Sequence, residues 1–172
     1  MAAQAHIVRD VHDADHDGVQ AVVAAAFGQD DEAALVGRLW AAGAITIERL
    51  AEIDGEIVGY CAFSPITCTP NLDGELLGLA PVAVAPAHQR TGLGAAMIED
   101  GLKACREAGA RLIAVLGHPE YYARFGFEPG AAKNIRWAER DAGDAFRIIT
   151  DDDMKTEQPR LVHYHPAFDA VS

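Results

Sequence analysis

The sequence has few positive charges. Fourteen Lys and Arg residues stand against 26 Asp and Glu residues, so the formal net charge is -12 at pH 7. Nucleic-acid affinity depends on Lys and Arg displacing the counterions that condense on the phosphate backbone. The charge balance therefore disfavours a nucleic-acid binder. It does not exclude a compact anion, which backbone N–H groups at a helix start can hold whatever the net charge.

Cysteine is scarce, and clusters of metal ligands are missing from the sequence. The three cysteines are an odd number at wide spacing, and none belongs to a CxxC or Cys/His run: Cys61, Cys68 and Cys105. We therefore expect packed thiols, with neither a disulfide framework nor structural zinc. His12 with His16, and His163 with His165, have spacings that suit two metal ligands, but neither pair has a third ligand in view. We expect no metal.

A long apolar run is also missing. Residues 1–10 lack the basic segment and the apolar stretch of a secretory signal. The uncharged stretch over residues 76–87 is broken by Pro81 and Pro86 and is too short to span a bilayer. We expect a soluble, cytoplasmic protein with no membrane partner.

Apolar residues are plentiful. They make up 50% of the 172 residues, which is enough for a compact core, so we expect one domain over residues 1–172. Apolar spacing predicts a helix that starts after Asp13 or Asp15, and further helices over residues 31–42, 93–108 and 120–126. Period-two and short apolar runs predict strands over residues 6–11, 45–53, 56–67, 76–86, 112–116, 146–150 and 161–164.

The connections between these elements predict the fold. A tight Asp54-Gly55 turn makes the strands over 45–53 and 56–67 antiparallel neighbours. The helix between 76–86 and 112–116 makes those two strands a parallel, right-handed unit. The predicted fold is α/β, with a mixed, largely antiparallel central sheet that contains a bulged strand and is flanked by helices. Exposed edge strands are compatible with a homodimer.

The predicted strand over residues 76–86 changes phase in its middle. Its larger side chains fall on odd positions at Leu77 and Leu79 and on even positions at Val82 and Val84, with Pro81 between them. Because strand side chains alternate with period two, one inserted residue is needed to keep both halves facing the same core. We predict a β-bulge at Pro81, which cannot donate to the ladder. An edge strand that contains a proline is the alternative.

The loop after this strand is rich in glycine and leads into a helix. Gly92 and Gly94 remove the Cβ atoms that would keep a ligand away from the backbone, and Arg90 adds a charged donor. Unpaired N–H groups and the helix dipole make such a start suitable for a pyrophosphate. The chain lacks the GxxxxGK[ST] of a P-loop and the third glycine of a dinucleotide fingerprint. Two interpretations of the loop remain: it binds a different phosphate-bearing cofactor, or it is a tight turn that binds nothing.

Two motifs here resemble those of the GNAT superfamily of acetyl-CoA-dependent N-acetyltransferases. The Q/R-x-x-G-x-G/A signature of that family opens a helix directly after a bulged strand, and it matches residues 89–94. An aromatic cluster of the form Y-x-x-F-G-F matches residues 122–127. The resemblance is strongest over residues 56–127 and looser from Gly130 onward. It implies transfer of an acetyl group from acetyl-CoA, as co-substrate, to a primary amine.

The resemblance also implies roles for particular residues. The pantetheine arm of CoA would pair with the bulged strand and the pyrophosphate would lie on the helix start, at Val82, Ala83, Val84, Gln89, Arg90, Thr91, Gly92, Leu93, Gly94 and Ala95. A backbone N–H near Val82 would polarise the thioester carbonyl. Tyr122 matches the tyrosine that gives a proton to the leaving thiolate, whereas the adjacent Tyr121 would pack or form a substrate wall.

The group that takes the proton of the amine is left open. An alkyl ammonium has a pKa of about 10 and must lose a proton before it attacks. Glu75, His118 and Glu120 are candidates by position. Gly117-His118-Pro119 stands where many members of the family carry an asparagine that orients the pantetheine. The alternative functions are a non-catalytic acyl-CoA sensor or interaction module and a different nucleotide binder.

Overall fold

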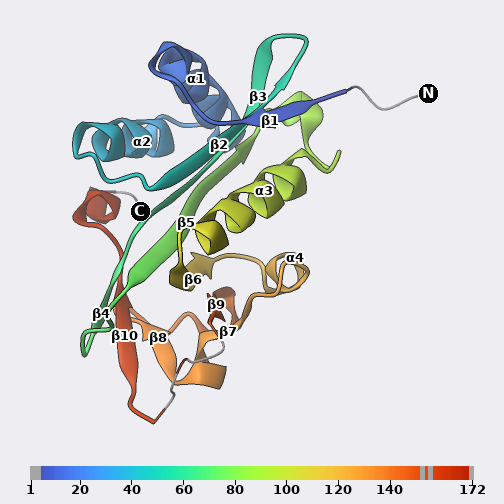
Figure 1. Ribbon diagram of the computed structural model, residues 1–172. Coiled ribbons are helices and arrows are strands. Elements are labelled where there is room, and N and C mark those ends of the chain that lie inside the picture. The colour runs from blue at the N-terminus through green and yellow to red at the C-terminus, as the bar shows by residue number, and fades with distance from the viewer. Residues whose placement is uncertain (1–4, 152–153, 155–156, 171–172) are drawn as a thin grey trace.

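The computed structural model describes residues 5–151, 154 and 157–170, and a mixed sheet forms its centre (Figure 1). In that part of the chain the sheet has seven strands, in the spatial order β1 (Ile7–Arg9), β2 (Ile47–Ile53), β3 (Glu56–Pro65), β5 (Glu75–Val84), β6 (Ala110–Leu116), β9 (Phe146–Thr150) and β7 (Glu128–Pro129). β5 and β6 are parallel, and the other neighbouring pairs are antiparallel. The predicted mixed, largely antiparallel sheet is confirmed.

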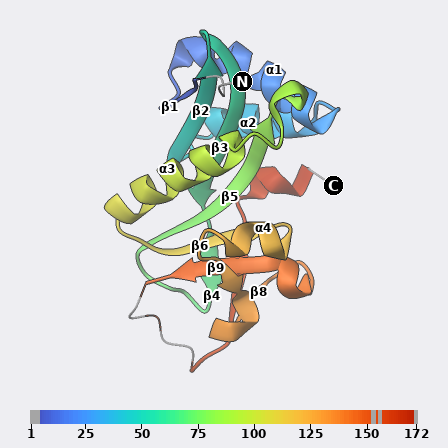
Figure 2. The same ribbon diagram turned by 90° about the vertical axis from the view of Figure 1, so that its right-hand side faces the viewer.

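Helices cover both faces of this sheet. They are α1 (His16–Phe27), α2 (Asp31–Ala41), α3 (Leu93–Glu107) and the short α4 (Pro119–Ala123). Figures 1 and 2 show α3 on one face and the pair α1 and α2 on the other. The side chains of β3 divide accordingly, because Phe63 packs in the core beside α3 whereas Tyr60 packs in the core beside α1 and α2. The apolar stripe predicted for α3 is buried, from Leu93 to Cys105.

The bulge predicted in β5 is confirmed. The register of β3 on β5 shifts so that one residue of β3 faces two residues of β5, Ala80 and Pro81. Leu79 before the bulge and Val82 after it therefore contribute to the same core beside α3. The alternative of an edge strand is wrong, because β5 lies between β3 and β6.

A second, smaller sheet closes the lower end of the molecule in Figure 1. Its strands are β4 (Thr67–Thr69), β10 (Arg160–His163) and β8 (Ile135–Trp137), with β10 between the other two. Residues such as Cys68 and Val162 of this sheet share a buried cluster with Leu76 of β5 and Leu112 of β6. The sequence analysis predicts β10 but not β4, β7 and β8, which are too short to carry a periodic pattern.

Short 3-10 segments lie between these elements and after β10. They are η1 (Asp13–Asp15), η2 (Pro86–His88), η3 (Gly130–Lys133), η4 (Gly143–Ala145) and η5 (Pro166–Ala170). The last of these packs on α2, where the Arg38 guanidinium donates to the Ala167 carbonyl oxygen at 3.2 Å. The C-terminal segment is thereby fixed beside the sheet.

α1 begins at His16, directly after Asp15, as predicted. Asp15 occupies the cap position but makes no capping hydrogen bond. Its carboxylate accepts hydrogen bonds from the Arg9 guanidinium at 2.8 and 3.0 Å and from the His12 N–H at 2.8 Å. The Arg9 guanidinium holds the pKa of Asp15 well below its usual range. The Asp15 carboxylate therefore links β1 to the start of α1. Because it is bonded to Arg9, it is not used to cap the helix N–H groups.

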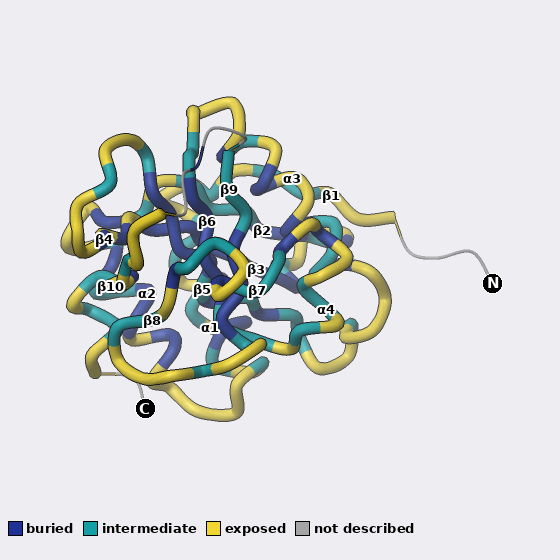
Figure 3. The backbone as a smooth tube through the Cα atoms, turned by 90° about the horizontal axis from the view of Figure 1, so that it is seen from below, coloured by how far each residue is buried: buried dark blue, intermediate teal, exposed yellow. Residues whose placement is uncertain are grey.

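The central strands are buried, as the dark blue tube in Figure 3 shows. The three cysteines are buried free thiols, as predicted. Burial raises the pKa of Cys61 and of Cys105 to about 12, so neither is a thiolate at neutral pH. Among the described residues, no helix has both the length and the apolar character that crossing a bilayer requires.

Candidate active site

The parallel strands β5 and β6 separate near the middle of the sheet. Their pairing ends with Leu79 opposite Val115, whereas β3 stays paired with β5 as far as Val84. The bulge at Ala80 and Pro81 follows directly after the last pair with β6. The second half of β5 therefore has a strand neighbour on the β3 side and an opening on the β6 side.

Peptide groups of β5 face this opening. The Ala85 N–H donates to the Val58 carbonyl oxygen at 2.8 Å, so the peptide groups of Ala85 face β3. Alternate residues of an antiparallel ladder bond to the same neighbour, so Ala83 faces β3 as well. Val82 and Val84 consequently direct their N–H and C=O groups into the opening, where an extended amide-bearing ligand can pair with them.

The glycine-rich loop returns the chain to the same end of β5. The Gln89 side-chain amide donates to the Val84 carbonyl oxygen at 3.1 Å, which joins the loop to the bulged strand. The Thr91 hydroxyl donates to the His88 carbonyl oxygen and closes the turn. Arg90 has a φ of 63°, a left-handed conformation that is uncommon for arginine, and its side chain is exposed. The predicted loop and strand residues are therefore neighbours in space.

The start of α3 forms a cradle of main-chain donors at residues 92–95. The first helical hydrogen bond runs from the Ala96 N–H to the Gly92 carbonyl oxygen at 3.0 Å, so the N–H groups of residues 93–95 have no partner within the helix. Gly92 has a φ of 90°, and a Cβ built there meets no heavy atom within 4 Å. Leu93 is buried and offers only its N–H group. These open donors fit the diphosphate of CoA, and the exposed Arg90 can add its charge.

Gly94 brings α4 into contact with this cradle. A Cβ at Gly94 would lie 3.0 Å from the Tyr121 hydroxyl and 3.6 Å from a Val84 methyl group. Tyr121 therefore reaches the helix start, and the Arg124 guanidinium lies over its ring at 4.6 Å from the centroid. Burial raises the pKa of Tyr121. The sequence analysis predicts that Tyr121 packs or forms a substrate wall. In the structure its hydroxyl group also lies beside the cradle.

Tyr122 packs at the end of β6. A Cβ added to Gly117, the residue after β6, would lie 2.4 Å from the Tyr122 ring. Edge-to-face contacts to Tyr121 at 5.0 Å and Phe127 at 5.8 Å fix the ring. Burial raises the pKa of Tyr122 to about 12, so the phenol carries its proton at neutral pH. Tyr122, on α4, packs against the same core as Val82 and Val84 of the second half of β5.

A cavity of about 590 Å³ borders the opening at Leu79, Ala80 and Leu116. Its other walls come from the small sheet and the C-terminal segment and include Trp137, Tyr164 and Phe168. The charged or titratable lining residues Glu139, Arg140, His163 and Asp169 are all exposed. The arrangement is an apolar pocket with a polar rim, which is the usual form of a small-molecule site.

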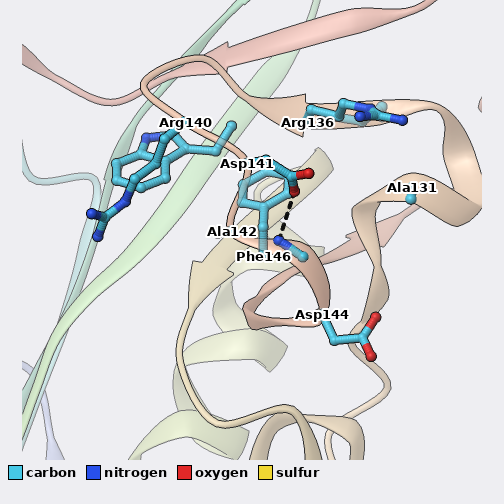
Figure 4. Close-up of a pocket in the computed structure, with 10 residues that line it drawn as sticks. Ala131, Arg136, Arg140, Asp141, Ala142, Asp144 and Phe146 are labelled. Atoms are coloured by element: carbon cyan, nitrogen blue, oxygen red, sulfur yellow. Dashed lines mark hydrogen bonds between the residues drawn. The ribbon is translucent and has the colours of Figure 1, made fainter.

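A smaller cavity of about 230 Å³ lies next to it, between η3, β8 and η4 (Figure 4). In the close-up, the Asp141 carboxylate accepts a hydrogen bond from the Gly143 N–H, at 2.8 Å, and Arg140 points away from Asp141 and Asp144. The Arg140 guanidinium lies over the Trp137 ring, at 5.4 Å from the centroid. Trp137 and Arg140 line both cavities and form the wall between them.

None of the three candidate bases is among the residues that line the cavity. Glu75 begins β5, four residues before the last pair with β6, which places it about 13 Å along the strand from the opening. His118 and Glu120 are exposed at the start of α4. In the part of the chain that the structure describes, no three His, Cys, Asp or Glu residues are grouped to hold a metal.

A family model and a curated relative both match this chain. The family model described as "Acetyltransferase (GNAT) domain" matches residues 7–130. The chain belongs to the GNAT acetyltransferase family. It is 34% identical over 156 residues to the uncharacterized N-acetyltransferase YhbS of Escherichia coli K12, a match that covers 90% of this chain and 93% of YhbS.

Two solved structures resemble this GNAT chain over nearly its full length. The crystal structure of E. coli YhbS in complex with CoA has a TM-score of 0.90 at 31% identity, covering 100% of this chain and 96% of that one. A GNAT acetyltransferase from Brucella melitensis in complex with acetyl-CoA has a TM-score of 0.80 at 32% identity, covering 97% and 100%. The predicted family and fold are confirmed, and the similarity extends beyond Phe127 into the C-terminal part.

The sequence analysis of this GNAT chain missed the apolar cavity. Trp137, Tyr164 and Phe168 lie in the stretch where the resemblance was loose, and His163 was weighed only as a metal ligand. Tyr164 and Phe168 are close in sequence, but nothing in that spacing shows that they meet β5. Their role as cavity walls depends on β10 lying beside β4 and on η5 lying on α2.

Proposed function

We propose that this GNAT acetyltransferase moves the acetyl group of acetyl-CoA to a primary amine by direct attack in the opening between β5 and β6. One observation carries the proposal. The second half of β5 leaves β6 and turns the peptide groups of Val82 and Val84 toward a space that ends at the cradle of α3. An ordinary parallel pair would have closed that space with ladder bonds.

The main chain binds and orients acetyl-CoA in this proposal. The N–H groups at the start of α3, with Arg90, receive the diphosphate, and Gln89, Thr91 and Leu93 shape the loop around it. Val82 and Val84 pair with the amide-bearing arm, while Ala83 holds β5 on β3. The two similar crystal structures, which contain CoA and acetyl-CoA, support this assignment.

The N–H group near Val82 stabilises the charge that develops on the thioester oxygen. A fixed N–H donor needs no reorganisation during the reaction and is commonly worth about 3 kcal/mol in the transition state. The cavity at Leu79 and Ala80 holds the amine on the other side of the acetyl group. Donor and acceptor therefore meet at the bulge.

Tyr122 supplies a proton to the leaving sulfur. The new C–N bond forms as the C–S bond breaks, the nitrogen loses one proton and the thiolate gains one. The Tyr122 phenol, with a pKa of about 12, holds its proton more tightly than a thiol of pKa about 8.5. It therefore regains a proton from the attacking nitrogen as it protonates the sulfur, and the proton balance closes without a metal.

Two measurements on the purified chain test the proposal. Calorimetric titration with acetyl-CoA should show one site, and a thiol reagent should show CoA release that depends on an added amine. Binding without thiol release for every member of a broad amine panel would favour the non-catalytic sensor instead. Protection by ATP or NAD, with none by CoA, would favour a nucleotide binder. One domain over residues 1–172, a cytoplasmic location and a homodimer stay predictions.

A further inference from the structure

We propose that Arg147 is a positioning residue for Tyr122, because its guanidinium fixes two main-chain segments that support the Tyr122 ring. Tyr122 is the proton donor in the proposed acetyl transfer, so this inference rests on that function. Arg147 lies on β9, outside the sequence motifs and outside the lining of the 590 Å³ cavity. Its role follows from the contacts of its side chain.

Arg147 lies in the row of the sheet at which β5 and β6 separate. It pairs with Val115 of β6, and Val115 pairs with Leu79 of β5 in the last pair of those two strands. Residues directly opposite one another in neighbouring strands share a face of the sheet. Because Leu79 and Val115 belong to the core beside α3, the Arg147 side chain leaves β9 on that face. Two strand spacings of about 5 Å separate it from β5.

The Arg147 side chain is a buried charge. The residue is 9% exposed, and all three of its hydrogen bonds to described residues go to main-chain carbonyl oxygens instead of a carboxylate. A guanidinium keeps its charge in proteins, and burying a charge without a counter-ion is costly, so an apolar side chain of similar volume would be easier to accommodate. The guanidinium therefore has a role that packing alone does not supply.

Two of these hydrogen bonds fix the segment that follows α4. The Arg147 Nε and Nη2 atoms both donate to the Phe127 carbonyl oxygen, at 3.2 and 3.0 Å. β7 begins only at Glu128, and its second residue, Pro129, has no N–H group to give to the ladder. The guanidinium thus holds the chain where this short strand makes few bonds. The buried Phe127 ring meets the Tyr122 ring edge to face, at 5.8 Å between centroids.

The third hydrogen bond fixes another support of the Tyr122 ring. The Arg147 Nη1 atom donates to the Asp144 carbonyl oxygen of η4 at 3.3 Å. The next residue of η4, Ala145, accepts a hydrogen bond from the Gly117 N–H at 3.0 Å. The Tyr122 ring packs on Gly117 so closely that an added Cβ would lie 2.4 Å from it. Two supports of the Tyr122 ring are therefore linked to one guanidinium.

The segment that carries Tyr122 depends on such contacts. α4 has five residues, and so short a helix is not stable by itself. The chain then turns at Gly126, whose φ is 95°. A planar guanidinium spans two carbonyl groups in a fixed geometry, whereas a lysine ammonium is a single point on a flexible stem. Arg147→Lys should therefore keep the positive charge and lose the alignment of Tyr122.

A double-mutant cycle tests whether Arg147 acts through Tyr122. The full chain, Arg147→Lys, Tyr122→Phe and the double variant are assayed for thiol release from acetyl-CoA with the amine of the panel that gives the highest rate. We expect Arg147→Lys to lower kcat about tenfold, since a small misplacement of a reacting group has effects of this size, and to leave the Kd for acetyl-CoA unchanged. In the Tyr122→Phe background the same change should lower kcat less than about twofold, because the group that Arg147 positions is absent.

Three further variants serve as controls. Ile149→Ala removes apolar packing from the same face of β9, so it should lower the melting temperature and leave kcat unchanged well below unfolding. Arg111→Lys removes a guanidinium bond to the Asp73 carbonyl oxygen, 2.9 Å long, at the other end of β6, and should also leave kcat unchanged. Arg147→Met removes the buried charge together with its hydrogen bonds. It should show the same loss of kcat, and it replaces Arg147→Lys in the cycle if that variant does not fold.

The outcomes distinguish the positioning role from the proposed function. A full additional loss of kcat in the double variant, an unchanged kcat in Arg147→Lys, or an equal loss in Ile149→Ala would overturn the role of Arg147 and leave the acetyltransferase intact. An unchanged kcat in Tyr122→Phe would instead show that the proposed function has the wrong proton donor, and Arg147 would then have nothing to position. Absence of thiol release with every amine would remove the proposed function itself.

Discussion

The opening between β5 and β6 has two sides, one formed by main-chain groups and the other by side chains. The cradle side consists of main-chain groups from one continuous stretch, residues 82–95, fixed by a bulge and by two glycines. The side that we propose for the acceptor consists of residues from β5, β6, β8, β10 and the C-terminal segment. Main-chain donors suit a ligand that is the same throughout a family, such as a cofactor. Side chains, in contrast, can be substituted in the sequence without a shift of the strand that carries them. The acceptor side is therefore where specificity can vary on this fold.

The largest expected effect lies where the two sides meet. Tyr122→Phe should lower kcat about 100-fold, because general acid catalysis is commonly worth at least that factor. The Kd for acetyl-CoA should not change, since the phenylalanine ring keeps the packing of the Tyr122 ring on Gly117. Thiol-release kinetics and calorimetry measure the two quantities. An unchanged kcat would remove Tyr122 from the mechanism, and Tyr121→Phe is the control that should alter binding only.

The pH profile of the wild-type protein sharpens the same point. Tyr122, with a pKa of about 12, keeps its proton throughout the usual assay range. The rate should therefore rise with pH as the free amine is deprotonated, toward the amine pKa of about 10, with no earlier alkaline decline. A fall in kcat above about pH 8 would show that a group of lower pKa supplies the proton.

A smaller effect is expected from the cradle itself. Gly94→Val should weaken CoA binding about 30-fold, because its Cβ would lie 3.0 Å from the Tyr121 hydroxyl and its methyl groups need further space beside Val84. The control is Ala104→Val, a half-buried position near the other end of α3. Calorimetry with CoA should separate the two variants. Equal Kd values would mean that the helix start is not the binding site.

Salt should affect the two sides differently. Raising NaCl from about 0.05 to about 0.5 M should weaken CoA binding several-fold, because screening acts on an anion held at an exposed helix start. The KM for a simple primary amine should change less, because most of the residues that line the cavity are uncharged. A common salt dependence for both ligands would contradict the division between the cradle and the cavity.

The smallest expected effect is on the pH dependence of stability, and it comes from Glu48, a carboxylate outside both sides of the opening. Glu48 accepts hydrogen bonds from the Trp40 indole at 3.1 Å and from the Tyr60 hydroxyl at 3.3 Å, but burial raises its pKa above the usual 4.5. The folded state then binds more protons than the unfolded state above pH 4.5, so the Glu48 contribution to stability falls as pH rises.

Glu48→Gln keeps an acceptor oxygen and removes this titration. The urea midpoint of the wild type should therefore decline relative to that of Glu48→Gln between about pH 4.5 and pH 8. Acetyl transfer at a temperature well below unfolding should be equal in the two proteins. A change in transfer rate would mean that the scaffold beside α1 and α2 communicates with the opening.

The features that the sequence predicts correctly depend on residues close together in the chain, as the main-chain side of the opening does. The phase switch at Pro81 predicts the bulge because side-chain alternation is a property of one strand and its core face. The Asp54-Gly55 hairpin and the α3 stripe are confirmed for the same reason. The helix start after Asp15 is confirmed, but the Asp15 carboxylate bonds to Arg9 and does not cap α1, which the spacing of apolar residues does not record.

The sequence by itself determined the longer elements, the bulge and the glycine-rich helix start, because each depends on neighbours within a few residues. The tertiary structure alone decided that Tyr121 lies beside Gly94 and that Tyr164 and Phe168 line a cavity with Leu79. These contacts join residues separated by tens of positions, and no local pattern records which of them the packing of the small sheet and η5 brings together.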